Sequence, residues 1–386
     1  MSDSEIKLYA NSHTSQNSSA PLATHEADRP PRDWRFWCII LSLGIPLMLT
    51  AIEFTAVGTA LPQIVNDLGR SQFVWVGSAY TLRSSAFLPF CGGLAQIFGQ
   101  RTAMLGTLFL FGLGSVLCGA STSLNFLIAG RTVQGLGGGA IAALIQIVIA
   151  DLVPLRDRGV FNGIMALAYA MGGGTGPIIG GSLAQHGNNW RWLFYLNLPI
   201  CGLAAIMVVV FMRLKMPKAP LLVQFSCMDW IGNFLIVSST MAIVIALTFG
   251  GLQFAWKMAN VPLPLILGLL GLCAFLVYEI LVAAHPIIPV RIIVTDRMTL
   301  SGYIQNFLNA MILATLSYWL PVYFQACKGA SPMASGVDIF GISFTVSPFA
   351  VIAGGVVQKL AKYRPPIWFR WSLTIIGLAL LTLVHS

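Results

Sequence analysis

The chain of 386 residues is too apolar for a water-soluble fold, because hydrophobic residues make up 56% of it and charged residues only 9%. In a soluble domain about a quarter of all residues are charged. The formal net charge of +9 would favour a nucleic-acid partner only if the basic residues clustered on one folded face, and they are instead spread over six loop regions. The composition therefore indicates an integral membrane protein without a nucleic-acid partner.

Motifs for catalysis, metal binding or ATP hydrolysis are absent from the sequence. The seven cysteines are scattered without a CxxC pair, and the five histidines form no HExxH pattern. A membrane enzyme would need a nucleophile with a base, or a metal cluster, and neither is found. The phosphate-binding pattern GxxxxGK[ST] is missing as well. We therefore expect a protein that is not an enzyme and has neither a metal nor a cofactor.

The chain begins with a polar segment and continues with eleven apolar runs. Residues 1–34 are rich in Ser, Asn and Thr and predict a disordered cytosolic tail. A helix that spans a bilayer needs about 20 mostly apolar residues. The runs of that length predict six spans in an N-terminal half (35–213), two in a linker (214–290) and three in a partial C-terminal half (291–386). They lie near 37–60, 74–97, 103–121, 124–150, 161–184, 193–212, 228–250, 262–284, 299–324, 337–358 and 367–385.

The basic residues fix the expected orientation. With the N-terminus in the cytosol, 16 of the 22 Lys and Arg residues fall in inner segments and only four in outer loops. Cytoplasmic loops of membrane proteins carry such an excess of Lys and Arg. We therefore expect an all-α multi-pass membrane protein with a cytosolic N-terminus.

The stretch "MGGGTGPIIGG", residues 171–181, predicts an unusually close helix contact in the fifth span. Gly172, Gly176 and Gly180 are four apart and share one helix face, while Gly173, Pro177 and Gly181 form the adjacent row. Small residues at this spacing let two membrane helices approach backbone to backbone. Pro177 adds a kink, because its ring clashes with the carbonyl group of Gly173, four residues earlier.

Extended by Gly163, this spacing (Gly163, Gly172, Gly176, Pro177, Gly180, Gly181) resembles the antiporter motif of the major facilitator superfamily. Three other stretches resemble motifs of the same family. "GGLAQIFGQRTAML" resembles its gating loop, with Gly92, Gly99 and Arg101 in place but glutamines at 96 and 100 instead of Asp and Arg. "RTVQGLGGG" resembles the fourth-helix motif, and "AIEFTAVGTALPQI" places Glu53 at the acidic position of the 14-span branch.

The resemblance implies a major-facilitator-type fold and membership of the fungal 14-span branch of drug:proton antiporters. That branch has six, two and six spans, so the chain lacks the last three helices and its second half is incomplete. The implied function is proton-coupled export of amphipathic or cationic small molecules, drugs or toxins, with protons and the lipid bilayer as the other partners. The proton gradient drives it, at the plasma membrane or alternatively the vacuolar membrane.

Two other functions stay open at this point. The chain could transport amino acids or siderophores, or it could be a truncated, non-transporting or partner-dependent membrane protein.

Charged residues inside spans are costly and need an explanation, because each costs about 2.5–3.5 kcal/mol at the bilayer centre. Glu53 and Arg131 each lie about seven residues from the outer end of their span, or roughly 10 Å below the surface. A nearby guanidinium favours the ionised carboxylate and desolvation favours the neutral acid. We therefore expect Glu53 to carry a proton and Arg131 to modulate it. The alternative is a fixed ion pair that braces the N-terminal half.

Four more residues are candidates for the substrate cavity, namely Tyr80, Arg83, Gln134 and Asn306. Arg83 could pair with Glu53, line the pathway or reach lipid headgroups. The polar residues could equally form interhelical hydrogen bonds, which contribute about 0.6 kcal/mol on average.

Overall fold

The computed structural model describes residues 33–69, 74–184, 187–212, 228–251, 254–283, 295–329, 345, 348–360 and 362–382. The chain divides into two units, Met1–Trp37 and Cys38–Ser386. Of the first unit, only residues 33–37 are described, so most of the expected tail lies outside the described residues. The described part of the chain is almost entirely helical, and its β pairing amounts to one isolated bridge between Gly250 and Phe254.

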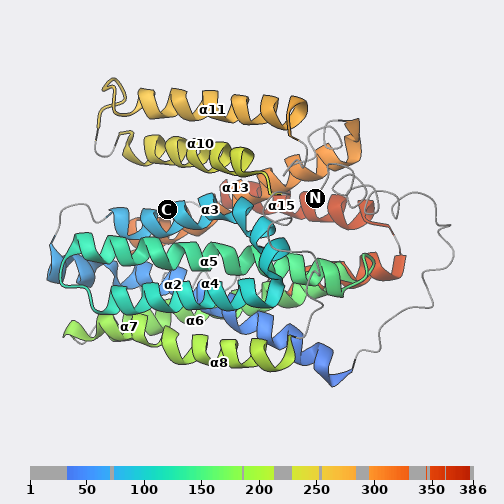
Figure 1. Ribbon diagram of the computed structural model, residues 1–386, viewed down its shortest axis with the longest axis horizontal. Helices are drawn as coiled ribbons and strands as arrows, with labels where there is room; N and C mark the ends of the chain where they lie inside the picture. Colours follow the sequence, from blue (N-terminus) through green and yellow to red (C-terminus); the bar gives the residue numbers. More distant parts are fainter. Residues whose placement is uncertain are drawn as a thin grey trace, which may run out of the picture. The chain divides into compact units, whose positions relative to one another are not determined.

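Helices lie where the apolar runs predict them (Figure 1). The first five runs of the N-terminal half correspond to α2 (Trp34–Leu68), α3 (Val74–Phe98), α4 (Gln100–Gly119), α5 (Leu124–Leu152) and α6 (Arg158–Ala184). The sixth run corresponds to two consecutive helices, α7 (Arg191–Tyr195) and α8 (Asn197–Phe211). The short 3-10 helix η2 (Gly187–Trp190) precedes them. The linker runs are α10 (Trp230–Phe249) and α11 (Pro262–Leu281), and the last runs are α13 (Arg297–Ala326), the helix Pro348–Leu360 and α15 (Arg364–Thr382).

Six of these helices are long and apolar enough to cross a membrane. They comprise the Trp34–Leu61 part of α2, then α4, α5, the Arg191–Phe211 segment of α7 and α8, α10 and α11. The expected tenth span, 337–358, is described only at 345 and from 348 onward, and residues 383–385 of the last one lie outside the described part. The expected total of eleven spans, like the proposed domain boundaries, therefore stays a prediction.

Side-chain caps explain where two of the helices begin. Ser123 precedes α5 and its hydroxyl accepts a hydrogen bond from the amide of Phe126 at 3.3 Å. Asp296 precedes α13 and accepts from the Thr299 hydroxyl at 2.5 Å and the Met298 amide at 3.1 Å. Such bonds satisfy amide groups that have no partner inside the helix. They also favour the ionised carboxylate, so the Thr299 hydroxyl, followed by the Met298 amide, holds the pKa of Asp296 below its usual value.

Glycines of α5 bring its backbone against both α3 and α4. A Cβ atom added at Gly135 would lie 2.5 Å from the carbonyl oxygen of Tyr80 on α3, and one at Gly137 would lie 2.6 Å from the amide nitrogen of Phe111 on α4. Only glycine permits this approach. The close packing of α5 against two neighbours fixes the position of the polar side chains that precede these glycines, Arg131 and Gln134.

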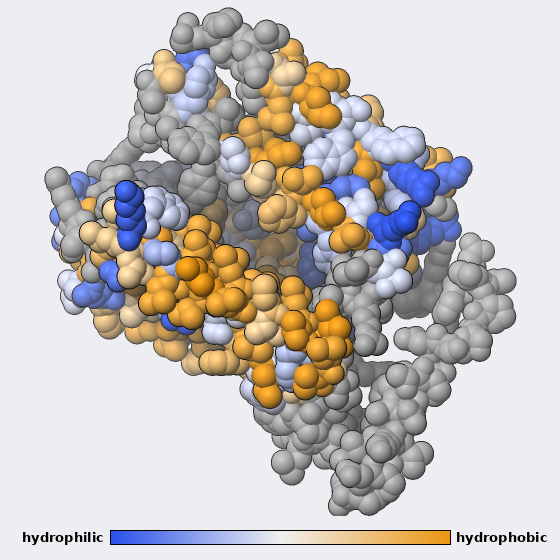
Figure 2. All heavy atoms as spheres, turned by 90° about the horizontal axis from the view of Figure 1, so that it is seen from above, coloured by the Kyte–Doolittle hydropathy of each residue, from blue (hydrophilic) through white to orange (hydrophobic). Residues whose placement is uncertain are grey.

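The described surface is rich in large apolar side chains, and Figure 2 shows them forming broad continuous areas on the face in view. Phe109 of α4, Phe234 of α10 and Leu281 of α11 are 69%, 72% and 74% exposed. Soluble monomers rarely present continuous apolar areas of this kind. The surface thus agrees with helices that face lipid rather than water.

Candidate functional site

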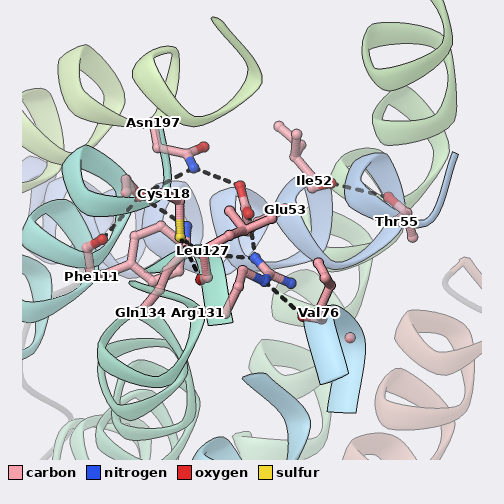
Figure 3. A network of polar contacts seen from close by, with 12 residues as sticks. Ile52, Glu53, Thr55, Val76, Phe111, Cys118, Leu127, Arg131, Gln134 and Asn197 are labelled. Carbon is pink, nitrogen blue, oxygen red and sulfur yellow. Dashed lines mark hydrogen bonds and ion pairs between the residues drawn. The ribbon is translucent and has the colours of Figure 1, made fainter. Parts of the chain in front are cut away.

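A polar cluster is buried in the middle of the N-terminal helices (Figure 3). It contains Glu53 from α2, Ser115 from α4, Arg131 and Gln134 from α5, and Asn197 from the start of α8. Arg131 is 2% exposed and the other four are completely buried. Arg131 and Gln134 are three residues apart and therefore lie on the same face of α5.

Glu53 and Arg131 form an ion pair at the centre of this cluster. The distance between Arg131 Nη1 and Glu53 Oε1 is 2.5 Å. Their equal depth along the two spans makes such a pair possible, and the structure places the two side chains in contact. Their roles in proton transfer are not decided by the contact.

An amide and hydroxyl shell surrounds the carboxylate. Asn197 Nδ2 donates to Glu53 Oε2 at 2.6 Å and lies 3.3 Å from Ser115 Oγ. Gln134 Nε2 donates to the same Ser115 oxygen at 2.8 Å. The Ser115 hydroxyl in turn donates to the carbonyl oxygen of Phe111 at 2.9 Å. The shell thus joins α2, α4, α5 and α8 through one carboxylate.

Arg131 has partners besides Glu53. Its Nη1 also donates to Gln134 Oε1 at 2.7 Å, and its Nε donates to the carbonyl oxygen of Val76 on α3 at 3.1 Å. The guanidinium carbon lies 4.6 Å from the centre of the Tyr80 ring, a distance typical of a cation–π contact. The positive charge is therefore supported from three sides even without the carboxylate.

These contacts determine what the cluster can do chemically. A buried charge is tolerated only when it is paired and hydrogen-bonded. Because Arg131 keeps three other partners, Glu53 can become neutral without leaving the guanidinium unsupported. The contacts of Arg131 with Gln134, Val76 and Tyr80 are thus independent of the charge on Glu53.

The glycine ladder of α6 packs against α2. Cβ atoms added at Gly172, Gly176 and Gly180 would fall under 3.0 Å from the carbonyl oxygens of Met48, Ile52 and Ala56, respectively. The predicted backbone contact is therefore confirmed. The adjacent row behaves differently, because Gly173 and Gly181 have no atom within 4 Å of such a Cβ among the described residues. Pro177 lies inside α6 as predicted.

The predicted gating loop is a tight turn between α3 and α4. Gly99 has φ of 78°, a left-handed conformation that favours glycine, and it lets α4 start directly after α3. Arg101 Nη2 donates to the carbonyl oxygen of Val209 in the last turn of α8 at 2.7 Å. Gln100, at the place of the family's arginine, hydrogen-bonds Asp151 of α5. A Cβ atom added at Gly92 would have no atom within 4 Å in the described part of the chain.

The N-terminal and C-terminal halves contact each other at one end of α6. Gln358, on the helix Pro348–Leu360, donates from Nε2 to Asp157 Oδ1 at 2.6 Å, and its carbonyl oxygen accepts from Arg156 Nε at 2.9 Å. A Cβ at Gly159 would lie 3.2 Å from Gly354 Cα, and one at Gly163 would lie 2.7 Å from the Cα of Val351. Gly163 of the antiporter motif therefore serves a contact between halves.

The candidate cavity residues are found in different places. Tyr80 and Gln134 belong to the buried cluster. Arg83 does not pair with Glu53; its hydrogen bond in the described part of the chain goes to the sulfur of Met241 on α10, at 3.9 Å. Asn306 is exposed on α13 and is absent from the lining of a cavity of about 650 Å³ between the first turns of α13 and α15.

Sequence reasoning missed Asn197 and Ser115 as members of the site. Both are polar residues within apolar segments, and Asn197 stands in "YLNLP", two residues before Pro199. The signal that could have found Asn197 is its depth, since it lies near the outer end of its segment, as Glu53 and Arg131 do in theirs.

Comparison with known proteins identifies the family. The model of the Major Facilitator Superfamily matches residues 43–386. The chain is 38% identical to the MFS-type transporter pydD of Acremonium sp, covering 92% of this chain and 62% of that protein. It is also 38% identical to the MFS-type efflux pump LUC4 of Fusarium sp, covering 96% of this chain and 66% of the pump. The chain thus spans about two thirds or less of the length of these relatives.

A solved structure supports the fold. The human organic anion transporter MFSD10 (TETRAN) aligns with a TM-score of 0.56 at 16% identity, covering 84% of this chain and 73% of that protein. The relatives are named as transporters and efflux pumps, not as enzymes. With its apolar helices, this is a multi-pass membrane protein, and the chain belongs to the major facilitator superfamily.

Proposed function

We propose that this chain belongs to a proton-coupled antiporter that exports amphipathic or cationic small molecules. Glu53 carries the proton, and Arg131 tunes how readily the carboxylate binds it. The protein works in the plasma membrane, with the N-terminus in the cytosol. Protons and an organic small molecule are the two transported partners, and the proton gradient supplies the energy.

The observation that carries this proposal is the burial of the Glu53–Arg131 pair among helices of a transporter. Both side chains are at most 2% exposed. Ionisable groups within the membrane mark ion pathways and proton relays in most cases. The three additional partners of Arg131 favour a carboxylate that changes its protonation state over an ion pair that only braces the fold.

Two further observations support export. The glycine ladder with Pro177 matches the spacing found in proton-driven exporters of the family, and it contacts α2 at the residue beside Glu53. The Fusarium relative carries the name of an efflux pump. An exporter that uses a proton gradient moves its substrate against the proton flow through alternating access of one central site.

The test is a transport assay in vesicles that contain the purified chain. A pH gradient is imposed, and movement of a lipophilic fluorescent cation is followed together with the internal pH. Wild-type protein should exchange the dye for protons. Glu53→Gln, which keeps the size of the side chain but cannot be ionised, should reduce gradient-driven exchange to the level of empty vesicles.

The matched control is Glu279→Gln, because Glu279 is also a buried glutamate, 5% exposed, but lies on the linker helix α11. This variant should retain exchange. Gradient-driven exchange of wild-type size in Glu53→Gln would refute the coupling role and leave the pair as a structural brace.

A further inference from the structure

We propose that Asn197 is a positioning residue whose side-chain amide responds to the protonation state of Glu53. When the carboxylate takes up a proton, the amide turns so that its oxygen faces Glu53 in place of its nitrogen. The inference rests on the proposed function, because it assumes that Glu53 is protonated during the transport cycle. It adds α8 to the two helices of the proton site, α2 with Glu53 and α5 with Arg131.

The geometry of the ionised state sets the starting point. Asn197 Nδ2 donates to Glu53 Oε2 at 2.6 Å, on the side of the carboxylate opposite to the Arg131 contact at Oε1. The oxygen end of the same amide has no comparable hydrogen bond. Asn197 Oδ1 is buried and accepts no hydrogen bond from the described residues. Such an unpaired buried acceptor is uncommon and calls for an explanation.

Protonation changes Glu53 Oε2 from a hydrogen-bond acceptor into a donor. A proton from water binds the carboxylate, which becomes a neutral acid, and the charge of the pair changes from zero to +1, held on Arg131. Oε1 faces the guanidinium, so the added hydrogen belongs on Oε2. It then meets the N–H group of Asn197, which is itself a donor. Two donors cannot bond to each other.

A half-turn of the Asn197 amide removes this conflict. It brings Oδ1 to the position of Nδ2, and the acid O–H then donates to Oδ1. The two ends of the amide have nearly the same size, so the turn needs no other movement. Among the described residues, one end of the amide lacks a partner in either orientation, Oδ1 before the turn and Nδ2 after it. The orientation therefore follows the protonation state of Glu53.

The turn also changes a contact between helices. In the ionised state Asn197 Nδ2 lies 3.3 Å from Ser115 Oγ of α4. Ser115 keeps its bonds to Gln134 and Phe111 when the amide turns. Protonation therefore weakens the α8–α4 bond and replaces the α8–α2 bond by one of the opposite polarity.

Few other titratable groups surround Glu53 in the described part of the chain. They are Arg131 from α5, Tyr80 from α3, Cys118 from α4 and Cys201 from α8. Tyr and Cys side chains are ordinarily neutral near and below neutral pH, and Arg stays charged throughout. A carboxylic acid signal from this cluster therefore belongs to Glu53 alone.

The test is infrared difference spectroscopy of the purified chain in lipid, between about pH 9 and about pH 4, which brackets the titration of buried carboxylates. Subtracting the Glu53→Gln spectrum isolates the acid C=O band of Glu53. In the wild type this band should lie at the wavenumber of a hydrogen-bonded acid. In Asn197→Leu, which has similar size but no acceptor, the band should shift upward, because the acid O–H loses its partner while Oε1 still accepts from Arg131.

Asn233→Leu is the matched control. Asn233 is also buried near the start of a membrane helix, α10, and its Oδ1 likewise accepts no bond from the described residues. Its Nδ2, however, donates to the backbone carbonyl oxygen of Asp229 and not to a carboxylate. The Glu53 band should be unchanged in this variant.

The outcomes separate the two proposals. A free-acid band in the wild type overturns the inference without any variant, which matters if Asn197→Leu does not fold. An unshifted band in Asn197→Leu also overturns it, while the proton-carrier role of Glu53 stands. If no band depends on Glu53 at any pH tested, the proposed function itself fails, and this inference fails with it.

Discussion

Replacing Arg131 by Met should destabilise the N-terminal half strongly, because Glu53 would lose its counterion while staying completely buried. Met fills much of the space of the Arg stem and carries no charge. Removing one partner of a buried ion pair costs about 3–5 kcal/mol. The variant also leaves Gln134 Oε1 and the Val76 carbonyl oxygen without the donors that lie 2.7 and 3.1 Å away.

Each of those lost hydrogen bonds to a charged group would cost about 1.5–3 kcal/mol by itself. The costs do not add, because the groups form one network. We therefore expect a loss of at least about 3 kcal/mol in the free energy of unfolding, which is more than a hundredfold in the unfolding equilibrium. The loss should be smaller at acidic pH, where Glu53 can become neutral.

The assay is reversible denaturant unfolding in detergent micelles followed by fluorescence, with the double variant Glu53→Gln/Arg131→Met beside each single one. The double variant should recover much of the lost stability, since it buries no charge. A loss below about 1 kcal/mol for Arg131→Met, or a double variant as unstable as Arg131→Met alone, would refute the reasoning. Either result would show that the buried Glu53 carboxylate does not depend on Arg131 as its counterion.

Three further outcomes are expected. Gly176→Leu should cost about 1–3 kcal/mol or more in thermal unfolding by overpacking the α6–α2 contact, whereas Gly173→Leu, with open space around it, should be tolerated. Gly354→Ala should weaken the contact between the halves, because its Cβ would lie 2.5 Å from the carbonyl carbon of Gly159, and the melting temperature should fall. Because the pKa of Asp296 is lowered, its cap stabilises α13 above about pH 4 and is lost as pH falls further; the protection of amides in that first turn, relative to their intrinsic exchange rate, should then decrease.

Hydropathy predicted the helices well but not their ends. The first apolar run predicts a span ending near residue 60, whereas α2 continues to Leu68. Its last turns are polar and leave the apolar segment while staying helical. There Asp67 Oδ2 accepts a hydrogen bond from the Trp190 indole at 2.7 Å. Hydropathy measures which residues face lipid, and a helix can extend beyond that region.

The site was partly predictable because two of its features have a strong sequence signal. A charge in an apolar span is rare, so Glu53 and Arg131 stand out, and glycines four apart identify the α6 face. Asn197 and Ser115 have no such signal. An Asn or Ser in an apolar span can bond its own backbone or a neighbouring helix at similar free energy, so packing alone decides which occurs.

Packing also explains why contacts at the end of α6 could not be predicted. Gln358 and Asp157 are 201 residues apart, and neither is unusual in its own segment. Their contact depends on how the two halves dock, which involves glycine backbones at Gly159 and Gly354 rather than a pattern of charges.

The position of α6 links the two parts of the molecule that the proposed mechanism needs. Its glycine ladder meets α2 at Ile52, the residue before Glu53, and Gly163, on the opposite side of α6, meets the second half at Val351. A packed backbone contact has little freedom to deform gradually. If α2 shifts when Glu53 binds a proton, α6 must shift with it or separate from it, and either movement changes the contact between the halves. The antiporter motif thus lies where a change at the proton site could reach the inter-half contact.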